Sequence, residues 1–172
     1  VVLVLPPIGS HGPAYYKRTP PAFKTFVPEC PSNALQQCSR EQVINTYDNT
    51  IVYTDHLLFS AINWLKARTR TDDTAMIYIA DHGESLGENN LYLHGLPYAL
   101  APDVQKRVPW ITWTSAALRQ RRRLDMACLG QQQERRLSHD NLFHSVLGLL
   151  DVQTSVYRPE LDIYAACSGA GG

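Results

Sequence analysis

The sequence predicts an α/β domain in which a small sheet is flanked by helices. Three apolar runs have the length of strands, at residues 1–5, 74–80 and 108–114. Segments with helical periodicity lie between and after these runs, and strands that alternate with helices are typical of α/β folds. The chain has 172 residues, of which 44% are hydrophobic. That length and composition are sufficient to bury a core of one domain.

The first predicted strand is VVLVL at residues 1–5. A buried parallel strand needs neighbouring strands, and the sequence holds none before this one. We therefore expect the chain to be the carboxyl-side part of a larger domain. The stretch at residues 6–33 is rich in proline and is expected to be a loop. Because it is much longer than a simple connection requires, we expect it to carry function.

A long amphipathic helix is predicted from residue 39 to residue 68. Ser39 followed by Gln42 is the pattern of a capping box, which begins a helix. Apolar residues then recur at helical spacing. They are Ile44, Tyr47, Ile51, Leu58, Ile62 and Leu65. Residues 116–137 carry many arginines and glutamines and contain no predicted element, and a capped helix is expected to begin near Ser138.

The four cysteines indicate the redox compartment. Cys30 and Cys38 bracket a short polar loop, which suits a disulfide. The alternative for this pair is a zinc knuckle, but no second pair of ligands has knuckle spacing. Cys128 and Cys167 are the candidates for a second disulfide. Two such bridges would place the chain in an oxidising compartment, outside the cytosol.

Charge and hydropathy exclude two classes of function for these residues. The formal net charge is zero and the pI is about 7.1, which argues against a nucleic-acid-binding protein that acts through bulk positive charge. No run of about 18 apolar residues is present, so nothing in this sequence is expected to span a bilayer.

Histidines and carboxylates gather where two predicted strands end. SHGP at residues 10–13 follows the first strand, and DHGE at residues 81–84 follows the second, with another His-Gly pair at residues 94–95. Ligands of open α/β sheets bind at the carboxyl ends of strands. Imidazole nitrogen and carboxylate oxygen both suit zinc. The candidate metal ligands are therefore Asp81, His82, His11 and His94.

A plain turn is the alternative for this segment, with Asp81 as a cap and His82 bonded to the backbone. Glycine directly after each of the three histidines lets the backbone turn tightly around a cluster. The other three histidines lie in helical patterns and are expected to be surface or packing residues. They are His56, His139 and His144.

Taken together, these motifs resemble the phosphoethanolamine transferases that modify lipid A, the enzymes of polymyxin (colistin) resistance in the alkaline phosphatase and sulfatase superfamily. The resemblance is carried by SHGPAYYKR, the Cys30–Cys38 loop, INTYDNTIVYTD, YIADHGESLGENNLYLHGLPYALAP and VPWITW. It implies an alkaline-phosphatase-like sheet of which residues 1–172 are the C-terminal portion. The first half of the catalytic domain and a membrane-spanning segment are expected upstream.

The resemblance also implies a role for each site residue. Asp81 and His82 match a pair that binds one zinc ion, together with a Glu and a Thr nucleophile expected upstream. His11 and His94 match catalytic histidines that hold a second zinc ion or the substrate phosphate. Glu84 matches a residue near the ethanolamine amine, which binds substrate.

The implied reaction takes phosphoethanolamine from phosphatidylethanolamine through a covalent Thr intermediate and passes it to a lipid A phosphate. The expected location is the periplasmic face of the inner membrane of a Gram-negative bacterium. Without the nucleophile, this chain alone is expected to bind zinc weakly and to transfer nothing.

Two other functions remain open from the sequence. One is that of another superfamily member, such as a sulfatase or a phosphoglycerol transferase. The other is a non-catalytic fragment that keeps the fold. Pro6-Pro7 stand where the resembled family usually has His-Gln, and proline offers no side-chain donor or acceptor to a substrate.

Overall fold

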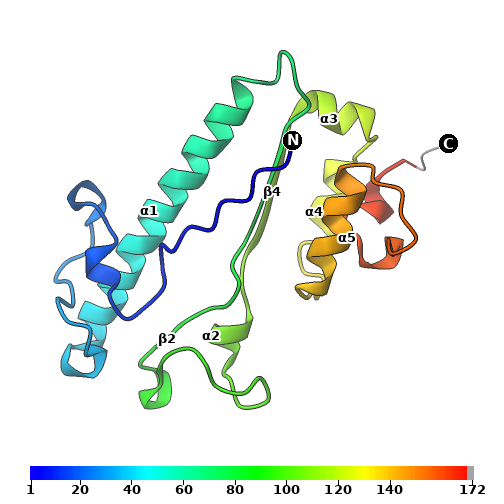
Figure 1. Cartoon of the computed structure of the whole chain (residues 1–172). Coiled ribbons are helices and arrows are strands. Elements are labelled where there is room, and N and C mark those ends of the chain that lie inside the picture. Colours follow the sequence, from blue (N-terminus) through cyan, green and yellow to red (C-terminus); the bar gives the residue numbers. More distant parts are fainter. Residues whose placement is uncertain (170–172) are drawn as a thin grey trace. The chain divides into compact units, whose positions relative to one another are not determined.

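The computed structural model describes residues 1–169, and their contacts divide the chain into two compact units (Figure 1). Unit 1 comprises Val1–Trp64 and Tyr78–Ile111, and unit 2 comprises Leu65–Ile77 and Thr112–Gly172. In chain order the helices and strands are α1 (Arg40–Lys66), β1 (Ala75–Ile79), β2 (Ser85–Leu86), β3 (Tyr92–Leu93), α2 (Asp103–Lys106), β4 (Trp110–Thr114), α3 (Ala116–Arg121), α4 (Met126–Gln131) and α5 (Asp140–Leu149).

Within residues 1–169, four strands form two small sheets, and the predicted strands at 74–80 and 108–114 are confirmed as β1 and β4. These two strands pair with each other, whereas β2 pairs with β3 in an antiparallel hairpin. The amide of Ser115 donates to the carbonyl of Thr74 at 2.8 Å, so the end of β4 lies beside the start of β1. The hairpin was not predicted, because strands of two residues show no periodicity.

The predicted strand at residues 1–5 is wrong. This segment has no regular structure, and its side chains are between 57% and 118% exposed. Its composition favours an extended backbone, but a strand also requires a partner whose amides and carbonyls complete its hydrogen bonds. None of the described strands pairs with it.

The long helix is confirmed as α1, and its start follows the predicted capping box. The amide of Gln42 donates to Ser39 Oγ at 3.2 Å, and the amide of Ser39 donates to Gln42 Oε1 at 2.9 Å. Each side chain thus satisfies an amide that the first turn of a helix leaves without a partner.

The buried face of α1 differs from the apolar face that the spacing predicted. Its fully buried residues are Val43, Thr46, Asn49 and Thr50, whereas Ile51 is 45% exposed. The polar side chains are buried because they bind the backbone of the Pro-rich loop. Thr46 Oγ1 accepts from the amide of Cys30 at 2.6 Å, and Asn49 bonds both the amide and the carbonyl of Phe26. The helix therefore supplies the hydrogen bonds that this loop lacks in itself.

Both predicted disulfides are confirmed, Cys30–Cys38 and Cys128–Cys167. Cys30 lies in the core of unit 1 with Tyr15, Leu35 and Val43. The second bridge links α4 to a short 3-10 helix at Ala165–Cys167 in unit 2.

Residues 116–137 contain two helices that the sequence interpretation did not predict. Ser115 Oγ accepts from the amide of Leu118 at 3.2 Å and starts α3, and Asp125 caps α4 in the same way. Both are good capping residues, and the glutamines and arginines that follow them favour helix. The helix expected near Ser138 is confirmed as α5, whose first amide donates to Ser138 Oγ at 3.3 Å.

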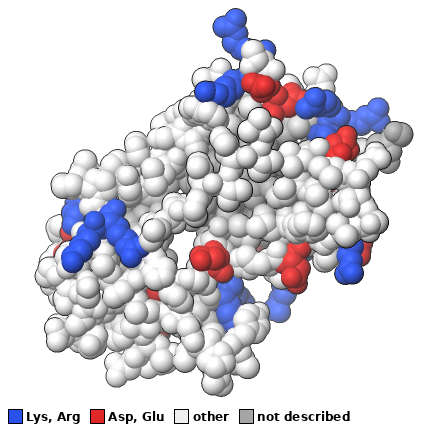
Figure 2. All heavy atoms as spheres, viewed as in Figure 1, with Lys and Arg blue, Asp and Glu red and all other residues white. Residues whose placement is uncertain are grey.

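Charged side chains of both signs are interspersed on the face shown in Figure 2, in keeping with the net charge of zero. Among the described helices, none combines the length and the apolar character needed to cross a bilayer.

Asn49→Ala is expected to destabilise unit 1. Asn49 is 0% exposed, and its loss would leave the amide and carbonyl of Phe26 without partners, at a cost of about 2–4 kcal/mol. Urea unfolding measures the change. Asn63→Ala is the matched control on an exposed position of the same helix and should have little effect. Equal stability of the two variants would contradict the role of the polar face.

Candidate metal centre

Three histidines from separate loops of unit 1 lie within ligand distance of one another. A ring nitrogen of each of His11, His82 and His94 lies within 4.8 Å of one in the other two. The ring centroids of His82 and His94 are 3.7 Å apart, and that of His11 is 5.0 Å from His94. His11 belongs to the Pro-rich loop, His82 follows β1 and His94 follows β3. The structure therefore brings together three of the four residues predicted as metal ligands.

The hydrogen bonds of these imidazoles indicate where their protons lie. In each ring, Nδ1 lies beside an atom that can only accept. The partners are the Gly12 carbonyl for His11 (2.6 Å), the Gly83 carbonyl for His82 (3.0 Å) and Glu84 Oε1 for His94 (3.1 Å). In a neutral imidazole, Nδ1 must then carry the hydrogen, and Nε2 keeps a free lone pair. Metal-binding histidines are held in this way.

Asp81, the fourth predicted ligand, lies beside the cluster with its side chain 89% exposed. Its Oδ1 accepts from the amide of His82 at 3.1 Å, and its Oδ2 lies 3.8 Å from His82 Nε2. Burial, and then the negative charge of Asp81, raise the pKa of the neighbouring Tyr78 hydroxyl. Asp81 Oδ2 therefore lies near the histidine nitrogen that can bind a cation.

Glu84 is buried beneath the cluster, and its side chain is only 3% exposed. Oε1 accepts from the amide of Gly12 at 3.3 Å as well as from His94. Oε2 is also buried, and the Tyr15 hydroxyl interacts with the carboxylate. Burial, and then the Glu84 carboxylate, raise the pKa of the Tyr15 hydroxyl, so Tyr15 stays neutral beside it.

The sequence interpretation missed the amide of Gly12 as part of this site, and it took Tyr15, in the run Tyr15–Arg18 beside His11, as a candidate for the border of a lipid entrance rather than as a neighbour of Glu84. The Tyr-Tyr pair that follows SHGP and Ala14 was the available signal for its place near His11. No sequence pattern indicates which backbone amide a distant carboxylate will bind, because that depends on how two loops pack.

Two of the His-Gly pairs are explained by close backbone packing. A Cβ atom at Gly12 would overlap the side chains of Leu93 and Tyr15, and one at Gly83 would overlap the carbonyl of Val104. Glycine therefore lets each loop lie directly against its neighbour and brings the adjacent histidine to the cluster.

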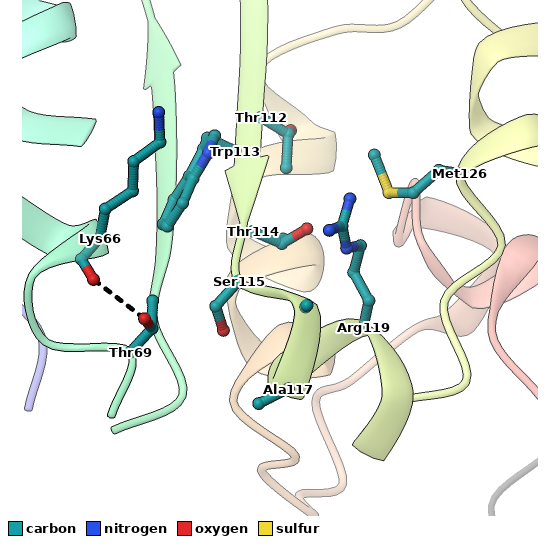
Figure 3. A pocket seen from close by; sticks show the side chains of 10 residues that line it. Lys66, Thr69, Thr112, Trp113, Thr114, Ser115, Ala117, Arg119 and Met126 are labelled. Atoms are coloured by element: carbon teal, nitrogen blue, oxygen red, sulfur yellow. Dashed lines mark hydrogen bonds between the residues drawn. The ribbon is translucent and has the colours of Figure 1, made fainter. Parts of the chain in front are cut away.

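A cavity of about 490 Å³ lies elsewhere, within unit 2 (Figure 3). Its polar lining comes from hydroxyls and cations, including Thr114, Ser115, Lys66 and Arg119. These are not the residue types that bind zinc, so the histidine cluster of unit 1 is the candidate metal centre.

The Sulfatase family profile matches residues 1–152, which is more than half of the chain. This chain belongs to the sulfatase family. The alkaline-phosphatase-like fold and the resemblance to phosphoethanolamine transferases are thereby confirmed, as the following relatives show.

The chain is 53% identical over 168 residues to the phosphoethanolamine transferase EptA of Salmonella typhimurium, a match that covers 96% of this chain and 30% of the relative. It is 40% identical over 114 residues to the Kdo(2)-lipid A phosphoethanolamine 7''-transferase of Escherichia coli, covering 66% of this chain and 19% of that protein.

Among solved structures, the integral membrane protein lipooligosaccharide phosphoethanolamine transferase A (EptA) of Neisseria meningitidis superposes with a TM-score of 0.90. The identity is 45%, and the match covers 94% of this chain and 30% of that one. This sulfatase-family chain therefore spans less than a third of the length of these relatives.

Gly83→Ala is expected to disturb the loop that carries Asp81 and His82. The new methyl group would overlap the backbone of Val104, and overpacking of this kind costs about 1–3 kcal/mol. Thermal unfolding and the imidazole NMR signals of His82 measure the effect. Gly130→Ala in α4 is the control, because a Cβ there meets no atom within 4 Å. An undisturbed His82 in Gly83→Ala would contradict the packing argument.

Proposed function

We propose that this chain is part of a zinc-dependent phosphoethanolamine transferase, which moves phosphoethanolamine from phosphatidylethanolamine to a phosphate of lipid A. The observation that carries the proposal is the convergence of His11, His82 and His94 from three loops. The names of the relatives support the choice of group transferred and of acceptor. Because the chain spans only part of those relatives, the activity is proposed for the whole protein.

The residues present fit zinc. In all three imidazoles Nδ1 bonds a protein oxygen, so Nε2 is the nitrogen left for a metal, and the Asp81 carboxylate lies beside one of them. Nitrogen and oxygen donors of this kind are the usual zinc ligands outside thiolate sites. When bound, zinc would polarise a phosphoryl oxygen and lower the pKa of a hydroxyl that it holds.

In the proposed reaction, a threonine hydroxyl of the whole protein attacks phosphorus in phosphatidylethanolamine. The phosphorus–oxygen bond to diacylglycerol breaks, and diacylglycerol leaves with a proton. A lipid A phosphate oxygen then displaces the threonine. Negative charge spreads over the equatorial phosphoryl oxygens in both steps. His11 and His94 would hold, through Nε2, the cation that offsets this charge, since their Nδ1 atoms already bond protein acceptors.

The proposed location is the periplasmic face of the inner membrane in a Gram-negative bacterium, where the modified lipid A would confer polymyxin (colistin) resistance. Two disulfides support an oxidising compartment. A membrane-bound donor and acceptor also require an enzyme that works at a membrane surface.

The histidine cluster is expected to bind zinc. Isothermal titration of the metal-free chain should show binding that His82→Ala and His94→Ala each weaken by at least about 10–100-fold, as loss of a metal-supporting group commonly does. His56→Ala is the control, because that exposed ring packs on Phe23 and is not one of the three clustered histidines. Unchanged zinc affinity in both cluster variants would contradict the proposed site.

The whole protein is expected to transfer phosphoethanolamine to lipid A. Mass spectrometry of lipid A from Gram-negative cells that express it should show the added group. His94→Ala should reduce transfer by about 10²–10³-fold, the usual cost of removing one group that stabilises charge in the transition state. Hydrolysis of sulfate esters without transfer would favour the sulfatase alternative. Neither activity in the zinc-loaded protein would favour a non-catalytic role.

A further inference from the structure

We infer that Glu84 is a positioning residue, which sets the tautomer of His94 and holds the loop of His11 beside it. The inference deepens the proposed function and rests on it for its consequence in catalysis. The geometry itself is independent of any metal or substrate.

One carboxylate oxygen joins two loops that are far apart in the sequence. Glu84 Oε1 accepts from His94 Nδ1 at 3.1 Å and from the amide of Gly12 at 3.3 Å. Gly12 directly follows His11, so the same oxygen restrains the backbone beside one histidine and the ring of another. Because the Glu84 side chain is 3% exposed, water does not compete for these two hydrogen bonds.

Both oxygens of the Glu84 carboxylate are enclosed by protein groups. The second oxygen, Oε2, is also buried. The Tyr15 hydroxyl is buried next to the carboxylate. Through Oε1, Glu84 therefore acts on neighbouring protein groups.

His94 depends on Glu84 in a way that the other two histidines do not. His11 and His82 each bond the carbonyl of the glycine that follows them. At His94 the following Gly95 has a left-handed backbone, with a φ of 109°, and Nδ1 bonds a side chain ten residues away. Without Glu84, the proton of a neutral His94 could move to Nε2, which would block metal binding through that atom.

The tautomer can be measured in the metal-free chain. Long-range ¹H–¹⁵N imidazole spectra at about pH 8.5, roughly two units above the ordinary histidine pKa, should show His94 with its hydrogen on Nδ1. In Glu84→Ala the signal should shift towards the Nε2–H form. Glu84→Gln should restore the Nδ1–H form in large part, because the amide oxygen can still accept.

The chain contains its own control for this experiment. His144 Nδ1 accepts from the amide of Arg158 at 3.1 Å, so its hydrogen lies on Nε2, the opposite tautomer. Its signal should not change in either variant, and it also reports that unit 2 is folded. An Nε2–H form of His94 in the unchanged chain, or an unaltered His94 in folded Glu84→Ala, would overturn the inference.

Zinc titration separates this inference from the proposed function. Glu84→Ala should lower zinc affinity by about 10–100-fold and Glu84→Gln by less than about 10-fold. A tautomer shift in a chain whose histidines bind no zinc would support the positioning role and contradict the metal site. Zinc binding that depends on His94 but not on Glu84 would support the metal site and contradict the positioning role.

Discussion

The hydrogen bonds between the polar face of α1 and the Pro-rich loop are the constraint on which the rest of unit 1 depends. An irregular loop lacks the regular backbone hydrogen bonds of a helix or sheet. Burying its amides and carbonyls without partners would lower the stability of the fold. Thr46 and Asn49 supply these partners from within the helix, and the Cys30–Cys38 bridge closes the loop near the helix start. With its backbone held in this way, the loop can bring His11 to a fixed place beside residues that lie more than 70 positions further along the chain.

Three groups orient the imidazoles of the candidate metal centre, and two of the three are backbone carbonyls. Carbonyls of Gly12 and Gly83 orient two imidazoles, and one buried carboxylate orients the third. Gly12 and Gly83 have a second role, because the absence of a side chain permits the close packing that brings the loops together. A preorganised cluster of this kind needs little rearrangement on binding a cation, which is an advantage where charge must be stabilised at the moment of reaction.

The two acidic residues of the DHGE motif, Asp81 and Glu84, differ in burial and in the groups that they contact. Asp81 is exposed beside the histidines and is available to a metal ion. Glu84, three residues later, faces inward and bonds protein groups. The strand end after β1 separates the two, since the chain turns at Gly83, where no larger residue fits. Two acidic residues of the same short motif can therefore have unlike roles, for reasons of burial alone.

The sequence by itself determined those features that depend on neighbouring residues: the capping box and extent of α1, strands β1 and β4, the short-range disulfide and the family motif around Asp81 and His82. The ligand roles of the four predicted residues and the place of the chain within a larger domain stay predictions. Tertiary structure alone decided that α1 buries a polar face, that residues 1–5 are not a strand, and that Glu84 bonds Gly12 and His94. Each of these depends on a partner distant in sequence, and periodicity carries no information about such partners.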